Sequence, residues 1–151
     1  MVGAEIRAAA VADVGTIEQI VERAYGGYVE RIGMRPGPMD ADYVEKVRGG
    51  LVSVVEKDGE VVGLLVLVEM PDHLLVENVA VDPGHQGAGI GRALLAHAES
   101  YAREATLGEL RLYTHSKMTE NRAFYAGLGY RETDRRDEEG FDRVFLVKRL
   151  D

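Results

Sequence analysis

The chain has 151 residues, of which 46% are hydrophobic and 29% are charged, and this length and balance predict a single globular domain over residues 1–151 rather than a disordered chain. The formal net charge of −8 argues against a nucleic-acid-binding protein, which needs a basic face. Cysteine is absent and the four histidines lack metal-ligand spacing, so disulfides and thiolate sites are excluded and we expect no metal.

The first third of the chain predicts a strand, a helix and an irregular region. A short strand at Ile6–Ala9 precedes an amphipathic helix for which Asp13 is a candidate N-cap. Gly26-Gly27 interrupts that helix. The region from Tyr25 to Tyr43 reads as irregular but apolar, which leaves two interpretations open: core packing beneath a loop, or a flap that lines a binding pocket. A second short helix is expected within Asp40–Arg48.

The middle of the chain predicts an antiparallel meander followed by a crossover. Strands at Val52–Lys57 and Val61–Met70 are joined by Asp58-Gly59, a strong hairpin turn signal. The apolar strand Leu74–Val81 comes next, then a helix, then a strand at Leu110–Thr114. Because a helical crossover joins these last two strands, they should be parallel.

The last part of the chain predicts a helix and a closing hairpin. Thr119 is a candidate N-cap for a helix through Leu128, which Gly129 ends. Strands at Arg131–Arg136 and Phe141–Leu150 follow. The pattern as a whole is a mixed α/β fold without the repeated alternation of a doubly wound sheet.

A glycine-rich turn, Gln86-Gly87-Ala88-Gly89-Ile90-Gly91, lies between a strand and a helix start. Glycines allow a ligand to approach the backbone, and the free N–H groups of a helix start favour a phosphate or pyrophosphate. A P-loop is excluded because Gly-Lys-Ser/Thr is absent. A dinucleotide site fits less well, because the spacing is Gly-x-Gly-x-Gly and the second strand ends in Tyr113-Thr114-His115 without an acid.

This turn, with Ala80-Val81-Asp82-Pro83 before it and the segment from Asn121 to Tyr130 after it, resembles the GCN5-related N-acetyltransferases (GNAT). The resemblance implies acetyl-coenzyme A as acyl donor. It also implies a mostly antiparallel, twisted sheet of about six to seven strands with one central parallel pair, flanked by about four helices. The cofactor-binding residues that it implies are Val79, Ala80, Val81, Gln86, Gly87, Ala88, Gly89, Ile90, Gly91, Arg92, Asn121 and Tyr125.

Tyr125 matches the family tyrosine that often protonates the departing coenzyme A thiolate. A phenol with a pKa of ~10 keeps its proton at neutral pH and can donate it to a sulfur anion. The alternative is an aromatic side chain that only packs against its helix neighbours. Met118 stands where many members carry a cofactor-binding asparagine, and Asn121, one turn before Tyr125, either substitutes for it or is polar surface.

Glu77 lies within the otherwise apolar strand Leu74–Val81, so its carboxylate must face solvent, a partner or a cleft. In the resembling family this strand borders the acyl site, and acids on it or on neighbouring strands can remove a proton from the incoming amine. The resemblance therefore makes Glu77 the candidate general base. The alternative is a residue on the solvated face of the strand. His115 is a second candidate base by its pKa range, although a loop histidine would look the same. In the resembling family, backbone groups at Val79 and Val81 hold the pantetheine arm and polarise the thioester carbonyl.

The sequence thus predicts an acetyl-coenzyme A-dependent N-acetyltransferase in which a primary amine attacks the thioester directly. A non-catalytic acyl-coenzyme A-binding regulatory module and, less well supported, a dinucleotide-binding domain remain alternatives. The acceptor can be a small molecule or a peptide or protein amine, and peptide termini, lysines and small polyamines all remain open. The final hairpin could pair across a homodimer. The N-terminus lacks a signal-peptide pattern, and the longest apolar run, Val61–Val68, is far shorter than the ~20 residues of a membrane span, so we expect a cytoplasmic protein without a membrane partner.

Overall fold

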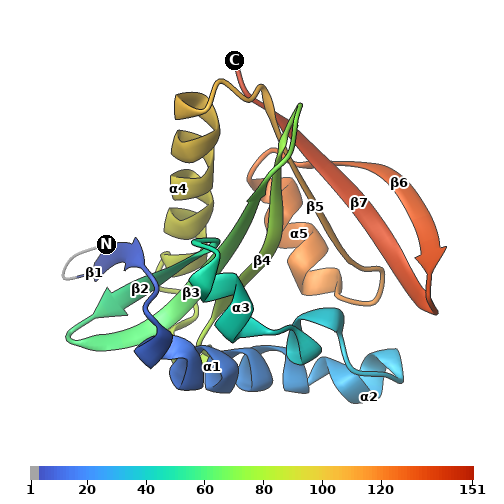
Figure 1. Cartoon of the computed structure of the whole chain (residues 1–151). Coiled ribbons are helices and arrows are strands. Elements are labelled where there is room, and N and C mark those ends of the chain that lie inside the picture. The colour runs from blue at the N-terminus through green and yellow to red at the C-terminus, as the bar shows by residue number, and fades with distance from the viewer. Residues whose placement is uncertain (1–3) are drawn as a thin grey trace.

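A computed structural model describes residues 4–151, which form one seven-stranded sheet with the strand order β1-β2-β3-β4-β5-β7-β6 (Figure 1). All neighbouring strands are antiparallel except β4 and β5, which are parallel as the crossover between them predicts. The strands are β1 (Ala4–Ala8), β2 (Val52–Lys57), β3 (Glu60–Glu69), β4 (Leu74–Val81), β5 (Glu109–His115), β6 (Arg131–Glu138) and β7 (Phe141–Arg149).

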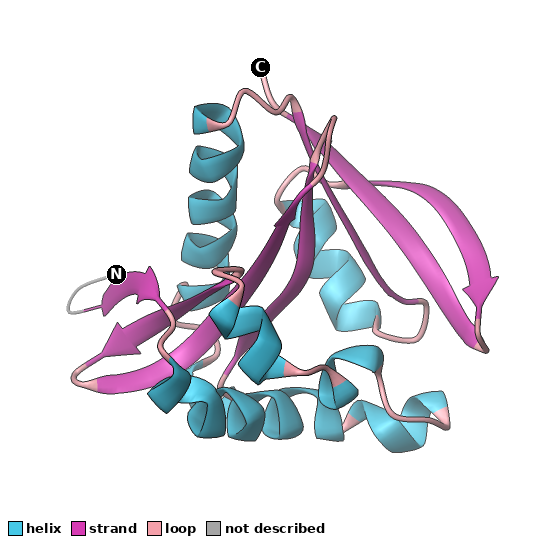
Figure 2. Cartoon of the chain, in the orientation of Figure 1, coloured by secondary structure: helices cyan, strands magenta, loops and turns pink. Residues whose placement is uncertain are grey.

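Helices cover both faces of this sheet (Figure 2). One buried cluster joins the apolar face of α4 to one side of the strands, and a second joins α1 and α3 to the other side. The apolar stripe of α4, which includes Leu94 and Ala98, and that of α1, which includes Ile17 and Ile20, are fully buried. The helices are α1 (Val14–Gly26), α2 (Tyr28–Ile32), α3 (Tyr43–Arg48), α4 (Ile90–Glu104) and α5 (Thr119–Gly127).

The mixed, mostly antiparallel fold is confirmed, with one helix more than expected. The extra helix is α2, which lies in the region expected to be irregular, together with a single 3-10 turn at Gly37–Asp40. Asp58 and Gly59 both have positive φ, at 52° and 82°, as the tight hairpin turn requires.

Two capping predictions were wrong in detail. Thr119 is the first residue of α5, after the N-cap Met118, and its hydroxyl donates to Glu120 Oε1 at 2.7 Å. Asp13 is the N-cap residue of α1, but its carboxylate accepts from the Ala10 N–H at 2.7 Å and from Arg7 rather than from the helix. Arg7 of β1 therefore binds the carboxylate that the local sequence predicts as the acceptor for the first N–H groups of α1.

Candidate active site

The parallel strands β4 and β5 pair over only a short length. Within residues 4–151, their register joins Leu74 to Leu110 and Leu75 to Arg111, and beyond these pairs the two strands diverge (Figure 1). The Asp82 N–H donates to Val62 of β3 at 2.8 Å. Because peptide groups alternate along a strand, those of Val79 and Val81 point away from β3, into the divergence.

A β-bulge in β4 lies beside this divergence. Val66 of β3 is opposite Asn78, but the next residue, Leu67, is opposite Val76, so Glu77 is the extra residue on β4. The bulge exchanges the faces of the strand: Val76 packs in the cluster beside α4, whereas Ala80 packs in the cluster beside α1. A one-residue insertion thus re-aims every side chain that follows it.

Two cavities adjoin each other here, and the larger of this pair, of about 540 Å³, lies along the C-terminal half of β4. It is lined by every residue of the predicted cofactor set except Ala88, which is exposed on the turn and does not line it. The sequence did not assign Tyr28, Glu120 or Phe124 to this site, although they also line the cavity. Tyr28 comes from α2, an element that only the fold brings here, whereas Glu120 and Phe124 lie on α5 beside the predicted Asn121 and Tyr125.

The glycine-rich turn has the backbone shape that its sequence predicts. Gly87 and Gly89 have φ of +85° and +83°, values that residues with a Cβ rarely adopt. A Cβ on Gly91 would lie 3.3 Å from the Phe124 ring, so α4 and α5 approach closely here. Gly89 is the N-cap of α4 and no side chain caps the helix, so its first N–H groups remain for a ligand.

Arg92 adds positive charge to the same turn of α4. A cation is disfavoured at a helix N-terminus, where the dipole is already positive. No ion pair links Arg92 to another described residue, so no carboxylate of the fold offsets this charge. The arrangement of free helix N–H groups with an unpaired guanidinium suits an anionic ligand such as a pyrophosphate.

The smaller cavity, of about 190 Å³, meets the larger one at four shared residues: Tyr25, Val79, Asn121 and Tyr125. It extends from this junction toward the loop before α3 and the β6–β7 hairpin. Its further lining residues are Ile32, Pro36, Gly37, Pro38, Ala41, Tyr43, Lys46, Val66, Val76, Glu77, Asn78, Leu112, Tyr113, Thr114, His115, Met118, Phe141 and Arg143.

The Tyr25–Tyr43 region packs against the core and also lines a cavity. Ile32 and Ala41 pack against the core cluster beside α1 and also line the smaller cavity. The loop is fixed by a buried polar chain in which Tyr25 Oη donates to Asn78 Oδ1 at 2.6 Å and Asn78 Nδ2 donates to Tyr43 Oη at 3.0 Å. The rigid attachment of this loop to β4 gives the smaller cavity a defined wall.

Tyr125 lies at the junction of the two cavities and is 7% exposed. Its ring packs against Phe124 and Tyr130, with centroids 5.6 and 5.7 Å away. No hydrogen bond joins its hydroxyl to another residue of the described chain, so this hydroxyl is free for a ligand. Burial raises the pKa of Tyr125 well above its ordinary value, which keeps the phenol protonated.

Asn121 also lies at the junction, one helical turn before Tyr125. Its amide contacts the sulfur of Met118 at 3.6 Å, and Thr114 Oγ1 donates to the same sulfur at 3.3 Å. Met118 stands where many family members carry an asparagine, and its side chain is buried, with 3% exposed. It therefore acts here as a core packing residue. The carbonyl of the Asn121 side chain remains free to accept from a ligand.

Glu77 faces the smaller cavity and forms an ion pair with Lys46 of α3 through Oε1. Both side chains are half-buried, so the simpler alternative of a fully solvated strand residue does not describe Glu77. The ion pair leaves the second carboxylate oxygen without a partner in the described chain. That oxygen can accept a proton from a group bound in the cavity.

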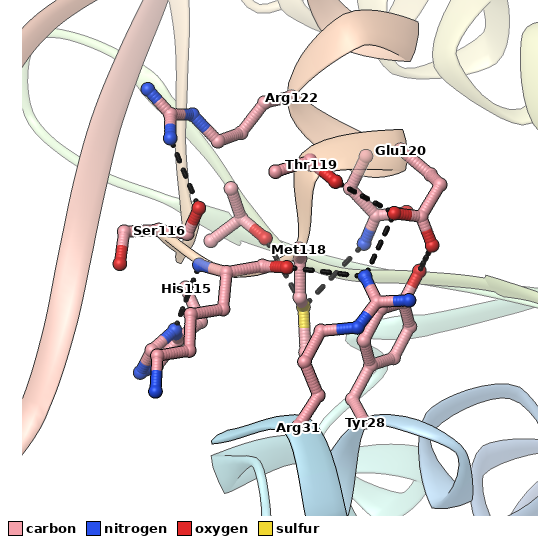
Figure 3. Close-up of polar contacts among 11 residues, drawn as sticks. Tyr28, Arg31, His115, Ser116, Met118, Thr119, Glu120 and Arg122 are labelled. Atoms are coloured by element: carbon pink, nitrogen blue, oxygen red, sulfur yellow. Dashed lines mark hydrogen bonds and ion pairs between the residues drawn. The ribbon is translucent and has the colours of Figure 1, made fainter.

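His115 is the last residue of β5 rather than a residue of the following loop, and it lines the smaller cavity. Its Nδ1 accepts from the Lys117 N–H at 3.1 Å (Figure 3). Desolvation by burial lowers the pKa of His115, so the neutral ring carries its proton on Nε2. Because the ring's one lone pair is already engaged by a backbone N–H, this histidine is poorly arranged to act as a base.

A polar bridge joins α2 to the start of α5 beside the junction (Figure 3). Tyr28 Oη donates to Glu120 Oε2 at 3.0 Å, and Arg31 Nη1 donates to Glu120 Oε1 at 2.8 Å. Arg31 also donates to the Lys117 carbonyl at 3.2 Å. These bonds lower the pKa of Glu120 to about 2, with Arg31 as the largest cause. The bridge thus fastens α2 to the start of α5 and to the loop before it.

Sequence reasoning missed Lys46 and Arg143 of the smaller cavity. Each lies on a polar side of its own element, where the local pattern resembles ordinary surface. Lys46 reaches Glu77 because α3 packs beside β4, and Arg143 reaches the cavity because β7 pairs with β5. No signal in the local sequence marks either contact.

Two further observations concern metal ligands and membrane spans. Within residues 4–151, no group of three or more histidine, cysteine or carboxylate side chains is arranged to hold a metal ion. The helices of this same range are all too short or too polar to cross a membrane.

Comparisons with known proteins agree with this geometry. Residues 16–130 match the family model described as the acetyltransferase (GNAT) family. The streptothricin acetyltransferase of Streptomyces lavendulae is 51% identical over 37 residues, which is 24% of this chain but only 20% of that relative's length. The aminoglycoside N(6')-acetyltransferase type 1 of Stenotrophomonas maltophilia is 26% identical over 140 residues, covering 83% of this chain and 92% of its own length.

Solved structures show the same fold. The PaiA N-acetyltransferase of Thermoplasma acidophilum, solved in complex with coenzyme A, superposes with a TM-score of 0.82 over 97% of this chain and 99% of its own. Its sequence identity is 18%, so the likeness is one of fold.

Proposed function

The chain belongs to the acetyltransferase (GNAT) family, and from this premise we propose that it transfers an acetyl group from acetyl-coenzyme A to a primary amine. The observation that carries the proposal is the meeting of the two cavities at Tyr25, Val79, Asn121 and Tyr125. Two substrates bound in them would place their reacting groups side by side at this junction, which supplies much of the rate through orientation.

The larger cavity would hold the acyl donor. The backbone of Gln86–Gly91 and the free N–H groups of α4 fit the pyrophosphate, and Arg92 lies beside them. The peptide groups of Val79 and Val81, which point into the divergence of β4 and β5, would bind the pantetheine arm. The N–H of Val79 would donate to the thioester oxygen and stabilise the negative charge that develops there.

The smaller cavity would hold the amine, and the residues around the junction would move its protons. As the acceptor nitrogen bonds to the acetyl carbon and the carbon–sulfur bond breaks, Glu77 would accept a proton from the nitrogen, directly or through water. Tyr125 would donate its proton to the departing thiolate, and solvent would restore it. Because the Nδ1 lone pair of His115 already accepts from the backbone N–H of Lys117, we assign the role of general base to Glu77.

The proposal is tested by titrating the protein with acetyl-coenzyme A in a calorimeter and then measuring thiol release with a panel of amines. We expect binding, and thiol release that depends on the amine. Failure to bind at millimolar acetyl-coenzyme A would overturn the proposal. Binding without turnover across the panel would favour the second candidate, a regulatory module that senses acyl-coenzyme A. Binding of a nicotinamide dinucleotide instead of acetyl-coenzyme A would favour the third candidate, a dinucleotide-binding domain.

Three further properties are proposed from the sequence alone. They are a single domain over residues 1–151, a cytoplasmic location and pairing of two copies as a homodimer. Two relatives are named for streptothricin and aminoglycoside acetylation, which makes polyamine antibiotics one class for the acceptor panel.

A further inference from the structure

The smaller cavity is more positive than the rest of this acidic chain. Its charged lining side chains are Lys46, Glu77 and Arg143, and its one histidine, His115, is kept neutral by burial, which lowers its pKa. Lys46 and Glu77 form an ion pair and offset each other. The charge that remains on the cavity wall is the guanidinium of Arg143.

Arg143 is held at the far end of the cavity by aromatic rings and by the loop before α3. Its guanidinium lies 4.6 Å from the centroid of the Tyr113 ring and 5.1 Å from that of Phe141. Its Nη2 atom lies 3.8 Å from the position that a Cβ on Gly37 would occupy, so the side chain spans from β7 to this loop. Stacking of this kind fixes a planar guanidinium and leaves its edge open for a ligand.

Most of the donors of Arg143 are unused. Nη1 donates to Glu138 Oε1 at 3.1 Å, and this is the one acceptor that it meets among residues 4–151. Glu138 does not line the cavity, and its side chain is 36% exposed. A guanidinium has five N–H donors in a fork that matches a carboxylate, so one contact leaves a bidentate edge free.

The size and walls of the cavity limit what can enter. Its volume of about 190 Å³ lies below the roughly 300–1,000 Å³ of sites for drug-sized ligands. Tyr43, Tyr113 and Phe141 give it apolar walls between the junction and Arg143. A small molecule with an apolar body therefore fits, with one end at Tyr125 and the other at Arg143.

We propose that the acceptor is a small amino acid-like molecule, whose amine reaches Tyr125 while its carboxylate binds Arg143. This inference rests on the proposed acetyl transfer and deepens it by naming the acceptor class. A polycationic acceptor would place a second ammonium group against Arg143, where like charges repel. The substrates for which the two curated relatives are named would thus be poor acceptors here.

The test compares matched amines with and without a carboxylate. Thiol release is measured with 6-aminohexanoate and with hexylamine, and with shorter and longer ω-amino acids to find the best spacing. We expect the best amino acid to exceed its matched amine at least tenfold in kcat/KM, mainly through KM. Equal or better use of the plain amines, or of an aminoglycoside, would overturn the inference while leaving acetyl transfer itself established.

Two variants test the role of Arg143 directly. Arg143→Met keeps an apolar stem against Tyr113 but removes the charge, and should raise KM for the amino acid about 10- to 100-fold while changing that for the plain amine less than threefold. Arg136→Met is the matched control, because Arg136 also stacks on a ring, 4.0 Å from the Phe145 centroid, but lies outside the cavity. Equal losses for both acceptors in Arg143→Met would mean a structural role and would overturn the inference.

A third variant should act in the opposite direction. Glu138→Gln removes the carboxylate that competes for Arg143 and should lower KM for the amino acid about two- to fivefold. If no amine is acetylated, calorimetry of 6-aminohexanoate with the protein saturated in coenzyme A still decides the question. Binding that Arg143→Met abolishes would support the inference even where the proposed transfer fails, and absence of binding would overturn it.

Discussion

Replacing Tyr125 with phenylalanine removes one hydroxyl from the junction of the two cavities and nothing else. As a general acid, that hydroxyl should contribute about 10²- to 10⁴-fold to turnover, and kcat should fall by this factor. The hydroxyl makes no hydrogen bond within the described chain, so its loss should cost less than about 1 kcal/mol of stability and shift Tm by only a few degrees. The affinity for acetyl-coenzyme A should change little.

Tyr130→Phe provides the matched control. Tyr130 packs its ring 5.7 Å from that of Tyr125, is also buried, and lines neither cavity. Its hydroxyl is buried and has no hydrogen-bond partner among residues 4–151, so removal should leave kcat unchanged and should leave stability equal or slightly higher. Thiol release under saturating acetyl-coenzyme A measures kcat, calorimetry measures affinity, and thermal unfolding reports the fold of both variants.

The pH dependence gives a second readout for the same group. Burial raises the pKa of Tyr125 well above its ordinary value, so its proton is retained throughout the neutral and mildly alkaline range. Up to about pH 9, wild-type kcat should therefore not decline through loss of the Tyr125 proton. The phenylalanine variant should accordingly show a pH profile of the same shape over this range. A phenylalanine variant with near wild-type kcat, or an equal loss in Tyr130→Phe, would refute the assignment of Tyr125 as the acid.

Three further outcomes are expected. Gly89→Ala should weaken acetyl-coenzyme A binding and cost about 1–2 kcal/mol of stability, because φ is +83°, whereas Gly84→Ala, with open space and ordinary φ, should be neutral in calorimetry and unfolding. Glu77→Gln should depress kcat/KM most near neutral pH, and an unchanged pH–rate profile would transfer the base role to water. Glu120 has a pKa lowered to about 2 from 4.5, so its bonds stabilise the fold above that ordinary value and are lost as pH falls toward 2. The Tm of Glu120→Gln should accordingly vary less with pH over this interval than the wild-type Tm, and an identical pH dependence would contradict this account.

The strand order of the central meander and the glycine-rich turn could be predicted because their signals are local. A turn at Asp58-Gly59 and a helix start after Gly89 depend on backbone conformations that few residues adopt. The apolar run of β4 and the helical spacing of apolar residues in α4 likewise indicate burial, whichever element each of them packs against. A local signal failed where a distant side chain competed, as when Arg7 took the carboxylate of Asp13.

The sequence by itself determined the elements, the parallel crossover and the turn that suits a pyrophosphate, since each follows from conformational preferences of neighbouring residues. The tertiary structure alone decided the bulge at Glu77, the divergence of β4 and β5, and the meeting of Lys46 and Arg143 in one cavity. These features depend on register and on packing between elements far apart in the chain. A shift of one residue in register exchanges the faces of a strand, and no local pattern fixes which side chains will then share a cavity.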